Sequence, residues 1–253
     1  MHAVRLDSGA IPRHTILGYL LRLPFALIPE QCVVRIVQGP LRGRRWITGA
    51  GPHGLWLGSY EVAKQKRLLE LLQPGQVFFD IGANAGIYTL LFSKAAGRHG
   101  QVHAFEPLPE NLVFLERHVA MNRADNVRVH PLALATSRGK ARFARSPSRF
   151  TAHLASDGEL EVDAIPLDDF VFADKYPLPN LIKIDVEGGE LAVLKGARRL
   201  LAEAPPAIFL ATHGLEAHDA CVKHLHSFGY RIEGLNHESF ETTDELVCLP
   251  PLK

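Results

Sequence analysis

The stretch that decides the fold is Asp80-Ile81-Gly82-Ala83-Asn84-Ala85-Gly86, which begins where an apolar run ends. Its glycines permit a tight turn and let backbone N–H groups approach an anionic group at the start of a following helix. Asn84 suits the turn because asparagine enters left-handed backbone conformations more readily than most residues. The stretch therefore predicts a strand, a glycine-lined loop and a helix, which is a building unit of open α/β sheets.

Short apolar runs alternate with helical patterns from this loop to the end of the chain. We expect strands over 76–80, 101–106, 127–135, 181–185 and 207–211, and helices over 87–96, 109–122, 189–202 and 217–228. This alternation predicts a mostly parallel sheet with helices on both faces, an α/β Rossmann-like fold. The last two apolar runs, 230–234 and 245–249, are joined by a short connection, so we expect them to form an antiparallel pair.

Two segments stand apart from the alternation. Residues 1–58 are expected to form an N-terminal extension, a candidate lid or oligomer contact, with an apolar helical segment, a β-hairpin over 33–48 and a loop over 49–58. The main domain, 59–253, is expected to open with an amphipathic helix over 61–72. An insertion at about 136–166 interrupts it with basic residues and irregular chain or short strands, and such loops often carry substrate specificity.

Composition limits the classes of protein to consider. The 253 residues are 47% hydrophobic and 22% charged, which is enough apolar material for one core and unlike a disordered chain. The net charge of +1 gives no general attraction to nucleic acid or to a membrane. The three cysteines lie far apart with no CxxC spacing, which argues against a disulfide framework and a structural zinc site and favours a cytoplasmic location.

The N-terminal extension has a surplus of arginine and an apolar run over 16–28 that is too short to cross a bilayer. A solvated basic face is the simplest interpretation. Peripheral membrane contact and a homo-oligomer contact are the alternatives for this segment.

Ligands of open α/β sheets bind beyond the carboxyl ends of the strands. Four polar residues stand at such ends: Asp80, Glu106, Asp185 and His213. Glu106 lies about 20 residues beyond Gly86, the separation at which an acid reaches the ribose hydroxyls in Rossmann-type sites. The loop and this acid together predict a site for an adenosine-containing cofactor. The simpler alternative is that Asp80 caps the turn and Glu106 caps the next helix.

Two other functions compete with this prediction. An NAD-type oxidoreductase is disfavoured because Asn84 and Ala85 break the spacing of the GxGxxG dinucleotide fingerprint. A non-catalytic Rossmann-like protein that only binds a cofactor is the second alternative.

Four motifs follow one another along the chain, over 80–89, 105–109, 122–127 and 184–190. This ordered set resembles that of FkbM-type methyltransferases, and the resemblance covers roughly 56–229. It implies a seven-stranded Rossmann-like fold, S-adenosylmethionine as cofactor, and methylation of a hydroxyl on a sugar, polyketide or related small metabolite. It also implies a set of cofactor contacts: Asp80, Gly82, Asn84, Gly86 and Glu106.

Methyl transfer to a hydroxyl is faster when a base removes the hydroxyl proton. The candidate bases are Asp185, Glu187 and His213; Asp185 ends a strand and is also expected near the cationic end of the cofactor. The simpler alternatives are that Glu187 favours a helix N-terminus and that His213 is a hydrogen-bonded loop residue. Many family members carry an acid late in strand five, where this chain has 209–214 without one, so that role is not carried over.

Asp185 and His213 could supply two ligands of a divalent metal, but no third carboxylate is identifiable, so no metal is expected. A nucleic-acid substrate is also disfavoured, because strand four ends in Ile-Asp-Val-Glu-Gly rather than in the Asn/Asp-Pro-Pro-aromatic type of segment. The basic segments 42–45 and 138–149 keep nucleic acid as an alternative partner.

Overall fold

The structure is a computed structural model, and it describes residues 28–145, 152–154, 158–235 and 238–252. The apolar run over 16–28 lies outside this range except for its last residue, so the predictions that depend on it stay predictions. No helix within the described ranges has both the length and the hydrophobicity needed to cross a membrane.

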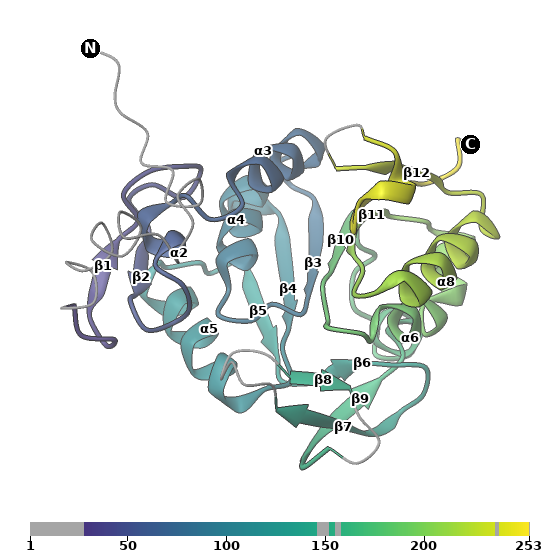
Figure 1. The fold of residues 1–253 in the computed structure, drawn as a ribbon, viewed down its shortest axis with the longest axis horizontal. Helices are drawn as coiled ribbons and strands as arrows, with labels where there is room; N and C mark the ends of the chain where they lie inside the picture. Colours follow the sequence, from purple (N-terminus) through teal and green to yellow (C-terminus); the bar gives the residue numbers. More distant parts are fainter. Residues whose placement is uncertain (1–27, 146–151, 155–157, 236–237, 253) are drawn as a thin grey trace.

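Seven strands form the main sheet, in the order β12-β13-β11-β10-β3-β4-β5, at the centre of Figure 1. Their bounds are β3 Val77–Ile81, β4 Gln101–Phe105, β5 Val127–His130, β10 Leu181–Ile184, β11 Ala207–Ala211, β12 Arg231–Gly234 and β13 Glu245–Leu249. Every pairing is parallel except those of β13 with β11 and β12. The predicted fold, including its antiparallel final pair, is confirmed.

Helices cover both faces of this sheet. Successive strand residues point to opposite sides, so neighbouring residues of one strand pack against different helices. The helices are α3 Val62–Leu71, α4 Ile87–Ala96, α5 Pro109–Met121, α6 Glu190–Lys195, α7 Arg198–Glu203 and α8 Leu215–His226. Phe78 packs in one core cluster with residues of α3 and α4, whereas Phe79 packs in another with residues of α6, α7 and α8. The two core clusters therefore lie on opposite faces of the sheet.

The helix predicted over 189–202 is two helices, so that prediction is wrong at its centre. At Gly196 a Cβ atom would lie 2.1 Å from the carbonyl oxygen of Ala135, so the chain passes too close there for another residue type. A second helix then begins because the Asp168 carboxylate accepts hydrogen bonds from the backbone N–H groups of Arg199 and Leu200, at 2.8 and 2.9 Å.

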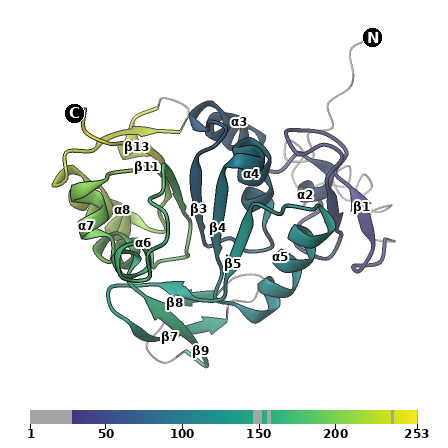
Figure 2. The ribbon, with the colours of Figure 1, turned by 180° about the vertical axis from the view of Figure 1, so that it is seen from behind.

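The strand predicted over 127–135 is also divided. β5 ends at His130, Pro131 follows, and the chain re-enters extended structure as β6, Ala133–Leu134, in a different sheet. This four-stranded sheet has the order β6-β9-β7-β8, with β7 Gly139–Arg145, β8 Ala152–Leu154 and β9 Leu160–Ile165. The insertion is therefore a small sheet, at the bottom of Figures 1 and 2.

The basic residues of the insertion that the structure describes are paired with acids. Arg138 forms ion pairs with Asp169 and Asp174, at 3.3 Å each. Lys140 pairs with Asp163 at 2.9 Å, on the neighbouring strand. Since the charges of Arg138 and Lys140 are partnered within the fold, these residues offer little free positive charge to a nucleic acid. The side chains of the other basic residues at 145 and 149 lie outside the described residues.

The predicted hairpin is present as β1, Val33–Arg35, antiparallel to β2, Arg45–Ile47. The segment expected as a loop contains a one-turn helix, α2 Gly54–Leu57, ended by Gly58 at φ 75°. In both ribbon views the hairpin and α8 lie at opposite ends of the sheet. Residues from the hairpin and α2 share a core cluster with the main sheet, so the described part of the extension is packed on the domain.

Candidate active site

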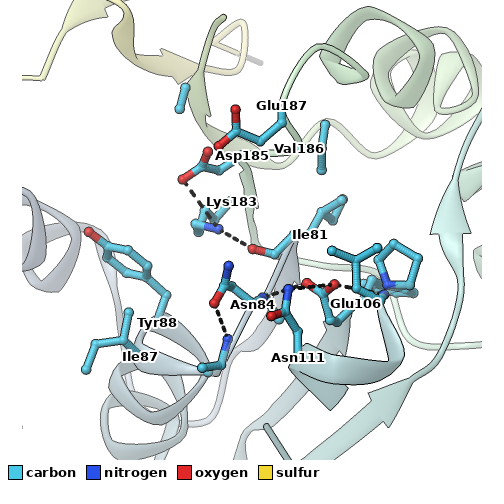
Figure 3. Close-up of a pocket in the computed structure, with 18 of the residues that line it drawn as sticks. Ile81, Asn84, Ile87, Tyr88, Glu106, Asn111, Lys183, Asp185, Val186 and Glu187 are labelled. Atoms are coloured by element: carbon cyan, nitrogen blue, oxygen red, sulfur yellow. Dashed lines mark hydrogen bonds and ion pairs between the residues drawn. The ribbon is translucent and has the colours of Figure 1, made fainter. Parts of the chain in front are cut away.

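A cavity of about 500 Å³ lies at the carboxyl ends of β3, β4, β10 and β11. Its size falls within the usual range for small-molecule sites. The glycine loop and Glu106 line one part, and Asp185, Glu187 and His213 line another. Figure 3 shows Asp185 and Glu187 at one end, with Glu106 and Asn111 at the other. The walls also include residues of the N-terminal extension and of the insertion, so all three parts of the chain meet here.

The glycine loop has the backbone conformation that its sequence predicts. Gly82, Asn84 and Gly86 have φ values of 75°, 50° and 94°. A Cβ atom on Gly82 would lie 1.9 Å from the carbonyl oxygen of Asp185. The loop therefore rests directly on the backbone that follows β10, and only glycine fits at this contact.

Glu106 is 4% exposed, and its two oxygens join the glycine loop to the start of α5. Oε2 accepts a hydrogen bond from the Asn84 N–H at 2.7 Å, while Oε1 accepts from the Leu108 N–H at 2.9 Å and from Asn111 Nδ2 at 3.2 Å. Burial raises the pKa of this carboxyl, although these hydrogen bonds oppose the rise. A carboxylate has about four acceptor positions, so Oε2 can still accept from a ligand hydroxyl.

Asp80 is placed differently from the other predicted cofactor contacts. It is fully buried and lies beneath the cavity rather than among its lining residues. Its Oδ2 accepts from Thr89 Oγ1 at 2.6 Å, and its Oδ1 lies 3.2 Å from Lys183 Nζ. Lys183 in turn donates to the Gly82 carbonyl at 3.0 Å. Asp80 thus supports the glycine loop through Lys183, its neighbour in the β3–β10 pairing.

Lys183 was missed from the sequence, as was a second buried lysine, Lys64 on α3. Lys64 Nζ lies 2.7 Å from Glu245, 3.5 Å from Glu61 and 3.8 Å from Asp185. Burial lowers the pKa of Lys64, but the three carboxylates outweigh it and the net shift is upward. A lysine within an apolar strand, as in Leu181-Ile182-Lys183-Ile184, was the available signal for the first; an amphipathic helix gives none for the second.

Backbone strain also gathers at the cavity. Five non-glycine residues of the described ranges have positive φ, and three of them, Glu61, Asn84 and Glu187, line the cavity. Such conformations cost free energy and occur most often at functional sites. Glu61 accepts a hydrogen bond from the Tyr88 hydroxyl, which fixes this edge of the wall.

The three candidate bases come together at one end of the cavity. His213 Nε2 lies 3.8 Å from Asp185 Oδ1 and 3.7 Å from Glu187 Oε2, while its Nδ1 is 2.6 Å from Glu190 Oε1. The hydrogen bond to Glu190, with the charges of Glu187 and Asp185, raises the pKa of His213 above its usual 6.5, although burial lowers it. His213 is therefore a stronger base than an ordinary histidine.

Asp185 links this group to the buried lysines. Burial raises the pKa of its carboxyl, but the nearby charges of Lys183, Lys64 and His213 together lower it by more than burial raises it. The net shift is downward, so Asp185 is held as an anion. Among the described residues, no group of three or more His, Cys, Asp or Glu side chains could hold a metal ion.

A family model described as the methyltransferase FkbM domain matches residues 80–232, which include every predicted site residue. The chain belongs to the FkbM methyltransferase family. Membership confirms the predicted family.

Individual relatives agree with this assignment. The hexuronic acid methyltransferase AglP of Haloferax volcanii is 35% identical over 138 residues, covering 53% of this chain and 55% of that protein. The 31-O-demethyl-FK506 methyltransferase FkbM of Streptomyces tacrolimicus is 30% identical over 158 residues, covering 49% of this chain and 60% of that protein. The chain thus spans little more than half the length of these curated relatives.

A solved structure shows the same fold. The methyltransferase FkbM from Methylobacillus flagellatus KT superposes with a TM-score of 0.51 at 22% identity, covering 71% of this chain and 48% of that one.

Proposed function

We propose that this FkbM-family methyltransferase transfers the methyl group of S-adenosylmethionine to a hydroxyl of a sugar, a polyketide or a related small metabolite. One observation carries the proposal: a single cavity has a glycine loop with an accepting carboxylate at one end and a histidine surrounded by three carboxylates at the other. The first arrangement suits an adenosine, and the second suits removal of a hydroxyl proton.

The residues present fit the cofactor. Oε2 of Glu106 has an acceptor position left for a ribose hydroxyl, and the loop of Gly82, Asn84 and Gly86 lines the cavity beside it. Asp185, held as an anion, suits the cationic end of the cofactor. When bound, the cofactor supplies an electrophilic methyl group. Asp80 acts from below, by holding Lys183 and through it the Gly82 carbonyl.

The opposite end of the cavity suits a hydroxyl-bearing acceptor. Glu61, Glu187 and Glu245 line it, and carboxylates accept hydrogen bonds from hydroxyl groups. His213 Nε2 is beyond hydrogen-bond distance of Asp185 and Glu187, so it can receive the proton that the acceptor hydroxyl loses. The printed names of two relatives, a hexuronic acid methyltransferase and a 31-O-demethyl-FK506 methyltransferase, support sugar-type and polyketide-type acceptors.

A cytoplasmic location goes with this proposal. Cys32, Cys221 and Cys248 are all free thiols, as expected in a reducing compartment.

Cofactor binding and turnover test the proposal separately. We expect S-adenosylhomocysteine at 100 times its Kd to stabilise the protein by about 2.7 kcal/mol in thermal unfolding. Glu106→Ala should abolish this stabilisation, whereas Glu116→Ala, an exposed carboxylate of α5, should keep it. His213→Ala should keep it too, but lose turnover by about 10²- to 10⁴-fold, the usual contribution of a general base.

Turnover is measured as the mass gain of one methyl group on a panel of sugar and polyketide acceptors. Stabilisation by NAD with none by S-adenosylhomocysteine would favour the oxidoreductase alternative. Binding of S-adenosylhomocysteine with no methylated product across the panel would favour the non-catalytic one.

A further inference from the structure

The imidazole of His213 is held from behind by a buried acid that sequence reasoning did not place in the site. Glu190, the first residue of α6, is fully buried, and its Oε1 lies 2.6 Å from Nδ1 of His213. The same oxygen accepts a hydrogen bond from the Gly188 N–H at 3.0 Å. The acid and the histidine lie 23 positions apart in sequence: Glu190 begins α6, whereas His213 lies between β11 and α8.

Two features show that Glu190 does more than begin a helix. Its Oε2 is buried with no hydrogen-bond partner among the described residues, although such groups cost free energy and are therefore rare. Its Oε1 is directed at a side chain of another element rather than only at the N–H groups of its own helix. The fold thus keeps an incompletely satisfied carboxylate against His213.

We propose that Glu190 is a positioning residue, which fixes the tautomer of His213 so that Nε2 is the nitrogen that accepts the acceptor's hydroxyl proton. A carboxylate at 2.6 Å requires the proton of the neutral imidazole to be on Nδ1, so Nε2 has the lone pair. Nε2 is the nitrogen turned toward Asp185 and Glu187 in the cavity wall.

The surroundings of the pair favour the protonated product of this step. His213 is faced by Glu190 of α6, by Glu187 of the preceding turn and by Asp185 after β10. On α8, which packs against α6, Cys221 faces Glu190, and burial raises the pKa of that thiol to about 12, so it stays neutral. Three carboxylates therefore raise the pKa of His213 against the opposing effect of burial, and Glu190 makes the largest contribution.

The catalytic role of the pair rests on the proposed function, but its protonation can be measured without an acceptor. The imidazole of His213 is titrated by NMR in the wild-type protein and in Glu190→Gln, with His213→Gln identifying the resonance. We expect the pKa of His213 to lie above 6.5 in the wild type and to fall in Glu190→Gln. Glu203→Gln, an exposed carboxylate at the end of α7, should leave it unchanged.

Kinetics with any methylated acceptor gives the second measurement. Glu190→Gln should lower kcat by at least about 10-fold, with the KM for S-adenosylmethionine changed by less than about 2-fold, and should move the pH midpoint of kcat downward. Glu190→Asp, which keeps the charge, should recover part of the loss and serves if Glu190→Gln does not fold. An unchanged titration of His213 in Glu190→Gln would overturn the proposal even if methyl transfer is observed. A shifted titration without any turnover would count instead against the proposed function.

Discussion

Gly82 contacts the backbone carbonyl of Asp185. This one contact connects the glycine loop, at the cofactor end of the cavity, to the end that holds the candidate bases. Gly82→Ala would place a methyl group 1.9 Å from that oxygen, at a φ of 75°. Gly75→Ala has a similar φ of 83° but no atom within 4 Å of the new Cβ, so it isolates the conformational cost, about 1–2 kcal/mol.

We expect Gly82→Ala to lose clearly more thermal stability than Gly75→Ala, and to lose S-adenosylhomocysteine binding in calorimetry, because the loop must move off the Asp185 backbone. Equal losses of stability in the two variants, with binding intact, would contradict the importance of this contact.

Single residues were predictable from the sequence where a strand end or a glycine marks them. Glu106, Asp185 and His213 follow apolar runs, and all three line the cavity. Lys64 and Glu190 were not found as site residues because each lies in a helical segment, where a charged residue usually faces solvent. Their roles depend on partners far away in sequence, which no local pattern encodes.

Among elements, the N-terminal hairpin depends on α5. Asn122 at the end of α5 accepts a hydrogen bond from the Arg45 N–H and donates to the Arg45 carbonyl, at 2.8 Å each, so its amide imitates a neighbouring strand. One turn earlier, His118 Nε2 accepts from the Ile47 N–H at 2.9 Å. We expect Asn122→Ala to speed hydrogen exchange at the amides of Arg45 and Ile47.

Mass-spectrometric exchange of the peptide covering 33–47 makes this measurement. Glu116→Ala, on the exposed side of α5, should leave that peptide unchanged. Equal protection of the peptide in the wild type and in Asn122→Ala would show that the core contacts of Trp46 hold the hairpin without the amide.

Element boundaries followed the sequence where local chemistry sets them. α4 starts after Gly86 and ends before Gly97, and both limits were predicted. The break at Gly196 and the change of sheet after His130 were not, because each arises from a distant backbone: Ala135 approaches Gly196, and β6 pairs with β9. These are tertiary effects on segments whose hydrophobic pattern alone is continuous.

For the whole molecule, three buried histidines predict how stability depends on pH. Burial lowers the pKa of His103 to about 3 and those of His118 and His130 to about 4; further contributions come from His130 and Arg128 for His103, from Arg117 for His118, and from Arg128 for His130. Since each folded-state pKa lies below the unfolded value of about 6.5, the unfolded chain binds more protons between pH 6.5 and about 4.

The free energy of unfolding should therefore be highest above pH 6.5 and fall as the pH decreases through this window, by up to about 1.4 kcal/mol per pH unit for each histidine. His213, with its raised pKa, changes in the opposite sense: its contribution is present at low pH and is lost as the pH rises through its folded pKa. Urea unfolding at a series of pH values measures the slope. His118→Gln should reduce the slope and the exposed His99→Gln should not; a slope unaffected by His118→Gln would contradict this assignment.

The small sheet of the insertion leaves and rejoins the domain at a single point. β6 and β9 are paired side by side, Ala133 with Ala164 and Leu134 with Ile165, so the departing and returning chains are adjacent. A segment anchored in this way can be exchanged with little disturbance to the body that carries it. Transplanting the corresponding segment from another family member is accordingly a route to redesigned acceptor choice, since Phe143 and Ala141 of this sheet form part of the cavity wall while Glu106 and the glycine loop lie outside the exchanged piece.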